Sequence, residues 1–340
     1  MILKSMPNGL PSPKLGETVD VIEEAAPTDA PASGGLLVKI VYFSVDPYLR
    51  GAMGTVGKPM RGFVAGKVLK VKNNSSWKEN DLFGANLPFT TVQAIPNEQI
   101  MGFLNLTKYI SEDELSLGIG LLGMPGSTAY AGLDLMDVES ADRVWISAAT
   151  GAVGSLAGQI AKNVKKCKLV LGSAGSKEKC EIATKNYGYD ACFDYHDASS
   201  TEGGMTALVK KHAPEGLNFY FENVGGDHFQ AAMNNMQEYG RIAVCGAISK
   251  YNAKEDSATG EPVALRALIY KSIRMEGFLC RRWLQAQKGN FLEDMSKWYR
   301  EGLVTKQETV YNGIEEWPKA FHSLFVEGNS NQGKVVVRVE

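Results

Sequence analysis

The sequence predicts an α/β protein in which a doubly wound parallel sheet is joined to a second, β-rich domain. From residue 143 onward, short apolar runs alternate with helical patterns, which is typical of a parallel sheet with helices on both faces. Before Glu112, short β-branched runs are separated by Gly and Pro, and no long helical period occurs. The chain has 340 residues, enough for about two domains.

The first part of the chain is predicted to be mostly strands. Residues 36–45 and 62–72 are rich in β-branched and apolar side chains, and the clusters at 73–76 and 78–81 predict turns. At 111–114, Ser-Glu-Asp-Glu has the form of a capping box ahead of an apolar run, which predicts the start of a helix.

The α/β part is predicted to contain six strands. They are expected at 143–148, 168–172, 191–195, 218–221, 241–245 and 274–279. Helices are expected between them, at 153–165, 177–187, 205–212 and 228–239.

The C-terminal part is predicted to begin with an amphipathic stretch at 284–301, followed by a helix at 315–326 and a strand at 334–339. That last strand could return to the first domain. The predicted domains are therefore 1–120 together with 305–340, and 121–304.

Composition excludes several classes of partner. Lys and Arg number 36 against 38 Asp and Glu, so no basic excess favours a nucleic acid. No apolar run reaches the roughly 18 residues that span a bilayer, and the N-terminus does not have the pattern of a signal peptide. We expect no nucleic-acid partner and no membrane partner.

The cysteines favour a reducing compartment. The five residues are Cys167, Cys180, Cys192, Cys245 and Cys280; they are odd in number and widely spaced, unlike a disulfide framework. We expect a cytoplasmic protein in which most of these thiols pack as small apolar groups.

The most informative segment, 143–162, reads as a strand, a tight turn and a helix. Ala149-x-Gly151-x-x-Gly154 is a dinucleotide-binding fingerprint whose first Gly is replaced by Ala. Gly151 would let the backbone approach a pyrophosphate, and Gly154 would let the helix pack closely on the strand. The N–H groups of the helix start, including those of Ala152 and Val153, would hold the phosphates. The alternative is a Gly-rich turn in an α/β domain that binds no ligand.

The end of the second strand favours NADP(H) over NAD(H). NAD-selective folds place an acid there to bind the ribose 2′-OH, but residues 171–179 have none at the strand end. Ser173, Lys177 and Lys179 instead offer the hydroxyl and cationic donors that a 2′-phosphate requires. The alternative is that the lysines form a solvated first helical turn.

Loops after the other strands supply further candidates, because the carboxyl ends of parallel strands line the ligand crevice. Tyr195 follows the third strand, Asn223 the fourth and residues 246–251 the fifth, and Phe278 and Leu279 end the sixth. Core packing is the alternative for Phe278 and Leu279.

Metal chemistry is not indicated. Residues 1–111 contain neither Cys nor His, and no C-x-x-C occurs in the chain. The four histidines, His196, His212, His228 and His322, are isolated, and we expect each to be exposed or hydrogen-bonded rather than a ligand. No nucleophile elbow or Ser-His-Asp arrangement is indicated.

Six stretches carry a family resemblance. They are Val-Asp-Pro-Tyr-Leu-Arg-Gly at 45–51, Gly-Met-Pro-Gly-Ser-Thr-Ala-Tyr at 123–130, residues 149–162, Asn-Val-Gly-Gly at 223–226, Cys-Gly-Ala-Ile-Ser-Lys-Tyr-Asn at 245–252, and Asn-Gln-Gly-Lys at 331–334. With them the chain resembles the zinc-free medium-chain dehydrogenases/reductases, most of all the prostaglandin reductase (leukotriene B4 12-hydroxydehydrogenase) and NADP-dependent alkenal double-bond reductase branch.

The resemblance implies a GroES-like N-terminal domain, a Rossmann domain, NADP(H) and a homodimer. Tyr48 and Met124 would line the substrate pocket together with Tyr251, which would lie near the reacting centre, and Tyr270 would assist it. The cofactor contacts that the residues and the resemblance together suggest are Gly151, Ala152, Val153, Gly154, Ser173, Lys179, Tyr195, Asn223, Cys245, Gly246, Ala247, Ile248, Ser249, Tyr251, Phe278, Leu279, Cys280 and Asn331.

Three departures from the family pattern concern the loops. Glu222 stands where the family usually has Asp, and Lys250 replaces a small or uncharged residue. The segment 252–262 is more charged than the family's proline-containing loop, which puts the substrate preference in doubt.

The hypothesis is reduction of the C=C bond of an α,β-unsaturated aldehyde or ketone by NADPH, with hydride added to the β-carbon. Without a metal, donors such as the Tyr251 hydroxyl must stabilise the enolate oxygen. A structural hydrogen bond that holds the loop is the alternative for Tyr251. Quinone reduction, zinc-free oxidation of a secondary alcohol and non-catalytic NADPH binding remain alternative functions.

Overall fold

The computed structural model describes residues 1–253, 264–286 and 290–339. By their internal contacts the residues divide into two units, and each is described by itself. The first comprises Met1–Met124 and Glu308–Glu340, and the second comprises Pro125–Gln307. The charged segment 252–262 lies outside the described residues except for its first two positions.

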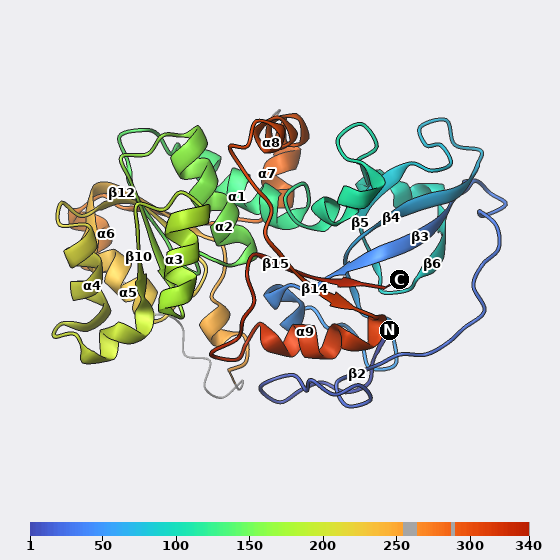
Figure 1. The fold of residues 1–340 in the computed structure, drawn as a ribbon, viewed down its shortest axis with the longest axis horizontal. Helices are drawn as coiled ribbons and strands as arrows, with labels where there is room; N and C mark the ends of the chain where they lie inside the picture. Colours follow the sequence, from blue (N-terminus) through green and yellow to red (C-terminus); the bar gives the residue numbers. More distant parts are fainter. Residues whose placement is uncertain (254–263, 287–289, 340) are drawn as a thin grey trace. The chain divides into compact units, whose positions relative to one another are not determined.

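The first unit is built on a mostly antiparallel sheet whose order is β14-β15-β3-β4-β5-β7, with β6 paired to β3 (Figure 1). Its strands are β3 (Gly35–Ser44), β4 (Arg61–Lys72), β5 (Leu82–Pro88), β6 (Val92–Pro96), β7 (Leu104–Asn105), β14 (Glu308–Asn312) and β15 (Lys334–Arg338). β15 pairs antiparallel with β3, with Val336 opposite Ser44, so the closing strand does return to the first part of the chain. A small sheet of β1 (Ile2–Leu3) and β2 (Val19–Asp20) completes the strands described in this unit.

Short helices connect and cover this sheet. They are η1 (Pro47–Arg50), η2 (Asn97–Gly102), η3 (Glu112–Ile119), η8 (Ile314–Glu316) and α9 (Trp317–Ser323). The helix predicted from the capping box is present as the 3-10 helix η3, and the Glu114 carboxylate accepts hydrogen bonds from the Ser111 N–H (3.2 Å) and hydroxyl (3.0 Å). The helix predicted at 315–326 is divided between η8 and α9.

Stacked aromatic side chains lie within the mainly aliphatic core of the first unit. Phe43 stacks on Phe89 with ring centroids 4.7 Å apart, and Trp317 stacks on Phe321 at the same separation. The Trp317 indole N–H donates to the Ser44 carbonyl oxygen (3.2 Å), so α9 is fixed to β3 by a buried hydrogen bond as well as by packing.

A buried ion pair holds the segment that follows β3. The Lys334 ammonium, 3% exposed, donates to the Val45 carbonyl (2.7 Å), the Val335 carbonyl (2.8 Å) and the Asp46 carboxylate (3.0 Å). Burial lowers the pKa of Lys334, and Asp46 counteracts that shift. All three ammonium donors are thus satisfied, as a buried charge requires. The Ser44 hydroxyl donates to the other oxygen of Asp46.

The second unit contains a six-stranded parallel sheet of order β10-β9-β8-β11-β12-β13 (Figure 1). The strands are β8 (Arg143–Ile146), β9 (Leu169–Ala174), β10 (Ala191–Asp194), β11 (Leu217–Glu222), β12 (Met236–Val244) and β13 (Arg274–Gly277). The order reverses between β8 and β11, which is the doubly wound arrangement that the alternating pattern predicts.

Helices cover both faces of this sheet. They are α1 (Met124–Leu135), α2 (Ala152–Gln159), α3 (Lys177–Asn186), α4 (Gly204–His212), α5 (Asp227–Asn235), α6 (Leu265–Tyr270), α7 (Cys280–Ala286) and α8 (Phe291–Arg300). Helices α4, α5 and α6 pack on the face that carries Trp145 and Tyr220, and α1, α2 and α3 lie on the opposite face (Figure 1). A π-helical turn, Ile160–Val164, continues α2.

The predicted helix at 228–239 is too long at its C-terminal end. Helix α5 ends at Asn235, and β12 begins at Met236 in register with Leu217 of β11. The Met236 side chain is buried in the core, so packing on β11 prevails over the helical pattern of the sequence. The amphipathic stretch at 284–301 contributes to two helices, α7 and α8.

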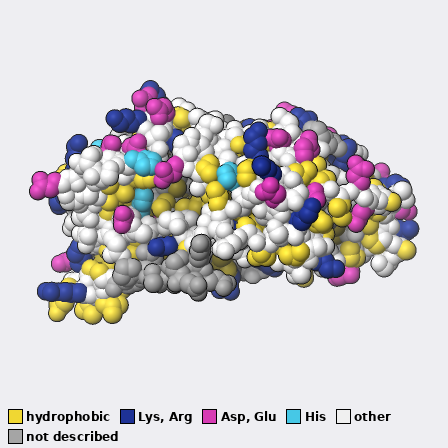
Figure 2. Space-filling view, turned by 90° about the horizontal axis from the view of Figure 1, so that it is seen from below, with side chains coloured by type: hydrophobic (Ala, Val, Ile, Leu, Met, Phe, Trp, Pro, Cys, Tyr) yellow, Lys and Arg dark blue, Asp and Glu magenta, His cyan; other side chains and the backbone are white. Residues whose placement is uncertain are grey.

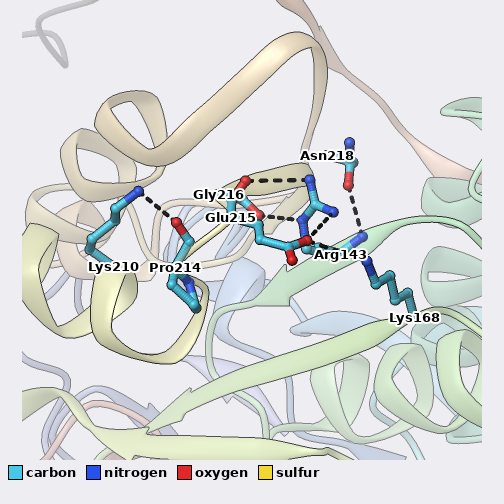
Figure 3. A network of polar contacts seen from close by, with 7 residues as sticks. All are labelled: Arg143, Lys168, Lys210, Pro214, Glu215, Gly216 and Asn218. Carbon is cyan, nitrogen blue, oxygen red and sulfur yellow. Dashed lines mark hydrogen bonds and ion pairs between the residues drawn. The ribbon is translucent and has the colours of Figure 1, made fainter.

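Polar contacts link neighbouring strands at the amino-terminal end of the parallel sheet (Figure 3). The Arg143 guanidinium donates to the carbonyls of Gly216 (2.8 Å) and Glu215 (3.3 Å) and pairs with the Glu215 carboxylate (3.0 Å). Lys168 reaches the same carboxylate at 3.3 Å, and the Arg143 N–H donates to the Asn218 side chain. These contacts join the starts of β8, β9 and β11.

The surface is mixed in charge. On the face seen in Figure 2, Lys and Arg side chains are interspersed with Asp and Glu side chains, in keeping with the net charge of −2. Among the described residues, no helix combines the length and apolarity that crossing a membrane requires.

His228, in the second unit, differs from the expectation that each histidine is exposed or hydrogen-bonded. His228 is 5% exposed, its ring stacks on Trp145 and meets Tyr195 edge-on, and its Nε2 atom has no hydrogen-bond partner. It is thus neither exposed nor fully hydrogen-bonded. Burial lowers the pKa of His228 to about 4. Two others match the expectation, since His196 contacts Asp194 and His322 contacts the Pro11 carbonyl. His212 is half-buried, and its ring stacks on Phe193.

Burial of neutral His228 makes the stability of the fold dependent on pH. Because its pKa is lowered to about 4 in the folded state, the unfolded chain binds more protons between pH 6.5 and pH 4, and stability falls as pH falls. Through His228, the unfolding free energy of the wild-type protein should fall by about 2 kcal/mol from pH 7 to pH 5. We expect the H228F variant to lack this contribution to the fall. Urea unfolding at the two pH values measures this difference, and an H228F protein with the wild-type dependence would contradict the prediction.

Candidate functional site

The loop between β8 and α2 has the geometry of a phosphate loop. Gly151 is the N-cap of α2, and its N–H donates to the Ala148 carbonyl (2.9 Å). A Cβ atom on residue 154 would lie 2.2 Å from that same carbonyl oxygen, so only glycine allows the helix to approach so closely. This close packing of α2 against the end of β8 is what the fingerprint predicts for its last glycine.

The first turn of α2 presents backbone donors. The N–H groups of Ala152, Val153 and Gly154 belong to the start of a helix, where no carbonyl of the same helix can accept from them. The aligned peptide dipoles add partial positive charge at this end. The arrangement suits an anion such as a pyrophosphate.

The predicted 2′-phosphate residues lie at the end of β9 and the start of α3. Ser176 caps α3, and its hydroxyl oxygen accepts from the Lys179 N–H (3.2 Å). The Lys179 side chain is half-buried, and burial lowers the pKa of its ammonium, so an anionic ligand would stabilise the charged form. Lys177 is exposed, as expected for a solvated first turn.

Tyr195 lies beside the same loop. A Cβ atom on Gly175 would be 3.1 Å from the Tyr195 hydroxyl, so this ring lies over the loop that joins β9 to α3. Ser173, in contrast, is fully buried, and its hydroxyl accepts from the Trp145 indole N–H (3.3 Å). The structure therefore brings Tyr195 to the loop but gives Ser173 a place inside the sheet, with no surface for a ligand.

The end of β11 is tied to the end of β8. The Asn223 N–H donates to the Ser147 hydroxyl (2.9 Å), and the Asn223 amide donates to the Ser147 carbonyl (2.8 Å). Oε1 of Glu222 accepts from the N–H groups of Val224 (2.6 Å) and Gly225 (2.9 Å). Burial raises the pKa of Glu222, because only part of the lost hydration is replaced by these hydrogen bonds.

The loop after β12 folds back on itself. The N–H groups of Ile248 and Ser249 donate to the carbonyls of Asn223 and Val224 (both 3.1 Å). A Cβ atom on Gly246 would lie 2.7 Å from the Tyr251 hydroxyl, which explains the glycine at this position. Residues 246–251 thus form one ordered loop beside Asn223.

Tyr251 is held as a protonated donor. Burial raises the pKa of its hydroxyl, and a hydrogen bond with the Ala247 backbone opposes the shift. At neutral pH the phenol is therefore protonated and able to donate a hydrogen bond. The contact with Ala247 also supports the structural alternative, in which the hydroxyl holds the loop.

The remaining candidates of the second unit differ in exposure. The Phe278 ring meets Phe221 edge-on at 6.1 Å and lies close to Gly132 of α1, which favours its packing role. Leu279 is 60% exposed, and the half-buried Cys280 begins α7. Burial raises the pKa of Cys245 to about 12, so its thiol stays protonated.

The prediction that Tyr270 assists Tyr251 is not supported by its position in this chain. Tyr270 ends α6 and is 75% exposed. The next residue, Lys271, contacts the start of β12 through hydrogen bonds to the Met236 carbonyl and from the Tyr239 N–H. The length of β12 therefore separates Tyr270 from Tyr251, which follows the other end of that strand.

Tyr48, Met124 and Asn331 belong to the first unit. Tyr48 lies in η1, directly after the Asp46 that pairs with Lys334, and its ring packs partly against the core. The Asn331 amide donates to the Ser323 hydroxyl (2.8 Å), and the Tyr311 hydroxyl donates to the Asn331 carbonyl oxygen at 3.5 Å. Met124 begins α1.

Two contributors were missed in the sequence. Ser147 joins β8 to Asn223, and Gly175 contacts Tyr195. Ser147 could have been found from its place at a strand end. Gly175 could not, because its neighbour Tyr195 is 20 positions away in the chain.

The described residues provide no place for zinc. Within 1–253, 264–286 and 290–339, no group of three or more His, Cys, Asp and Glu side chains could hold a metal ion. The donor set does not fit a zinc centre, and no step of the chemistry below uses one.

Comparisons with known proteins agree with this geometry. Residues 152–297 match the family described as zinc-binding dehydrogenase, and residues 1–101 match the N-terminal domain of oxidoreductase. The chain is 37% identical to prostaglandin reductase 1 of Bos taurus over 308 residues, covering 90% of this chain and 89% of that protein. It is also 37% identical to a 2-alkenal reductase (NADP(+)-dependent) of Nicotiana tabacum, covering 90% and 88%.

A solved structure is similar over the full chain. The CurA protein of Vibrio vulnificus in complex with NADPH has a TM-score of 0.83 and 32% identity, covering 100% of this chain and 98% of that one. The fold, the phosphate loop and these relatives lead to one assignment. The chain belongs to the medium-chain dehydrogenase/reductase family, in the branch of the prostaglandin reductases and NADP-dependent alkenal double-bond reductases.

Proposed function

We propose that the chain is an NADPH-dependent reductase of the C=C bond of α,β-unsaturated aldehydes and ketones. The observation that supports this function most strongly is a phosphate loop and a half-buried lysine, Lys179, at neighbouring strand ends. The relatives of the chain include a 2-alkenal reductase. The cofactor follows from the same residues, and the similar CurA protein binds NADPH.

The residues present fit NADPH. The backbone of residues 151–154 would hold the pyrophosphate, because the N–H groups of the first turn of α2 have no acceptor in the same helix. Lys179 and Tyr195 flank the loop where the 2′-phosphate would bind. Bound NADPH would supply the hydride that adds to the β-carbon of the substrate. The other proposed contacts with NADPH are Asn223, Cys245, Gly246, Ala247, Ile248, Ser249, Tyr251, Leu279, Cys280 and Asn331. We propose that Phe278 and Ser173 support these contacts by packing and do not bind the cofactor themselves.

Tyr251 is the proposed catalytic residue. When hydride adds to the β-carbon, negative charge develops on the carbonyl oxygen of the substrate, and a protonated phenol can stabilise it by donating a hydrogen bond. The phenol of a tyrosine is protonated at neutral pH, and burial raises the pKa of Tyr251 further. We propose Tyr48 and Met124, with Tyr251, as substrate-binding residues, and water or Tyr251 as the source of the α-carbon proton.

We also propose a homodimer. β13 is an edge strand of the six-stranded sheet, and its outer side has no partner strand among the described residues. Large apolar side chains are exposed on α6 and β13, namely Leu265, Ile269, Tyr270 and Met275. A second copy paired along this edge would cover them.

Two further proposals concern location and organisation. All five cysteines are free thiols, which supports a reducing compartment such as the cytoplasm. We propose functional domains of 1–120 with 305–340, a GroES-like substrate domain, and 121–304, a Rossmann domain for the cofactor.

A substrate panel tests the function. With NADPH, we expect a 2-alkenal or an enone to give the saturated carbonyl compound, identified by mass spectrometry, at a higher kcat/KM than a quinone. A faster quinone reaction would favour quinone reduction, and activity only with NADP⁺ and a secondary alcohol would favour alcohol oxidation. Tight NADPH binding without consumption would indicate a non-catalytic protein.

Tyr251→Phe tests the proposed donor. We expect kcat to fall about 100-fold while the Kd for NADPH stays unchanged, because only the transition state uses the hydroxyl. The matched control is Y239F, at an exposed tyrosine of β12. Wild-type kcat would remove Tyr251 from the mechanism, and a raised Kd for NADPH would show that the hydroxyl holds the loop instead.

Lys179→Met tests the 2′-phosphate contact. The variant keeps most of the aliphatic stem but loses the charge, so we expect KM for NADPH to rise roughly tenfold with little change for NADH. K185M is the control, since Lys185 is on the same helix but pairs with Glu181 at 2.8 Å. An equal rise for both nucleotides would contradict the assignment.

A further inference from the structure

Two of the five thiols are in contact. The Sγ atoms of Cys180 and Cys192 lie 2.9 Å apart, with the Cys192 thiol donating to Cys180. Cys180 is in the first half of α3, and Cys192 is in β10, against which α3 packs. A disulfide bond is about 2.05 Å long, so an approach of about 0.9 Å would join the two sulfurs. This pair departs from the expectation that most thiols pack as isolated apolar groups.

The surroundings give the two thiols different roles. Cys180 lies one turn inside α3 and is buried, whereas Cys192 lies in β10 and is half-buried. The Cys192 thiol donates to the Cys180 sulfur, and this hydrogen bond and burial raise the pKa of the Cys192 thiol. The Cys192 sulfur therefore keeps its proton, so we assign the attack on the oxidant to Cys180 and the resolving step to Cys192.

Cys167 and Cys245 differ from this pair. Cys167 is buried and directs its thiol to the Glu139 carbonyl at 3.5 Å, and burial raises its pKa to about 12. Burial likewise raises the pKa of Cys245 to about 12. Thiols that stay protonated react slowly with oxidants.

The two cysteines are close in the chain to the residues proposed to bind the 2′-phosphate. Lys179 is adjacent to Cys180, and its N–H makes the capping bond to Ser176. Tyr195 follows Cys192 by three residues, and its hydroxyl lies over Gly175. A bond between the two sulfurs would tie the turn of α3 that carries Lys179 to β10.

We propose that Cys180 and Cys192 form a reversible disulfide when the protein meets a hydroperoxide, and that the disulfide weakens binding of the 2′-phosphate of NADPH. This effect on the cofactor depends on the proposed function, whereas formation of the disulfide does not.

The reaction balances in two steps. The Cys180 sulfur attacks the outer peroxide oxygen, the O–O bond breaks, an alcohol (water, from hydrogen peroxide) leaves and Cys180 becomes a sulfenic acid. The Cys192 sulfur then attacks Cys180, the S–O bond breaks, and hydroxide leaves as water with the Cys192 proton. Two thiols lose two electrons to the peroxide, and an external dithiol such as dithiothreitol returns them.

Peptide mapping tests the disulfide directly. The full chain is treated with hydrogen peroxide and digested with trypsin without reduction. We expect peptides 180–185 and 186–210 to appear as one linked species, two mass units lighter than their sum, and to separate after dithiothreitol. A link that involves Cys245 or Cys280 instead, or irreversible oxidation without a link, would overturn the proposal.

Nucleotide titration tests the consequence. For the oxidised protein we expect the Kd for NADPH, measured by fluorescence, to rise roughly threefold to tenfold, with the Kd for NADH unchanged and full reversal by dithiothreitol. C180S and C192S should keep the reduced-state Kd and lose the response, and C167S should keep both. An unchanged Kd in a fully linked protein would overturn the effect on the cofactor.

The outcomes separate this proposal from the proposed function. A linked protein that binds NADPH but reduces no enal would leave the disulfide in place and refute the function. An active reductase in which peroxide forms no link would refute the disulfide alone.

Discussion

The loops of the candidate site depend on Glu222, at the end of the central strand β11. Its backbone carbonyl accepts the N–H groups of Cys245 (2.9 Å) and Gly246 (3.1 Å), and its carboxylate accepts those of Val224 and Gly225. The next residue, Asn223, is bonded to Ser147. Three neighbouring strand ends are therefore held in one arrangement before any ligand binds, and a preorganised edge of this kind reduces the free-energy cost of binding.

The alternation of strands and helices was predictable because the spacing of apolar residues along the chain shows which face of each strand or helix is buried. The doubly wound sheet and the return of the last strand to β3 both agree with the structure. The C-terminal limit of α5 was not predictable, since Met236 leaves the helix in order to pair with Leu217, a partner fixed only by tertiary packing.

The candidate site was partly predictable. The phosphate loop follows from its glycine spacing, and the structure supplies the cause, the close approach of residue 154 to the Ala148 carbonyl. The location of Ser173 and Tyr270 did not follow from their motifs, because burial and helix direction decide which side chains reach the strand ends. The contact of Cys180 with Cys192 also arises only when α3 packs on β10. Residues that act through local backbone geometry were found, and those that act through packing were not.

The buried Lys334 has a consequence for the order of folding during synthesis. The ribosome makes Asp46 early, but the ammonium that neutralises it lies in the last strand, and the whole second unit is translated between them. Until that strand emerges, β3 has an open edge and Asp46 has no counter-charge. The second unit can fold as soon as its own residues are available, whereas the first must wait until β15 has been translated.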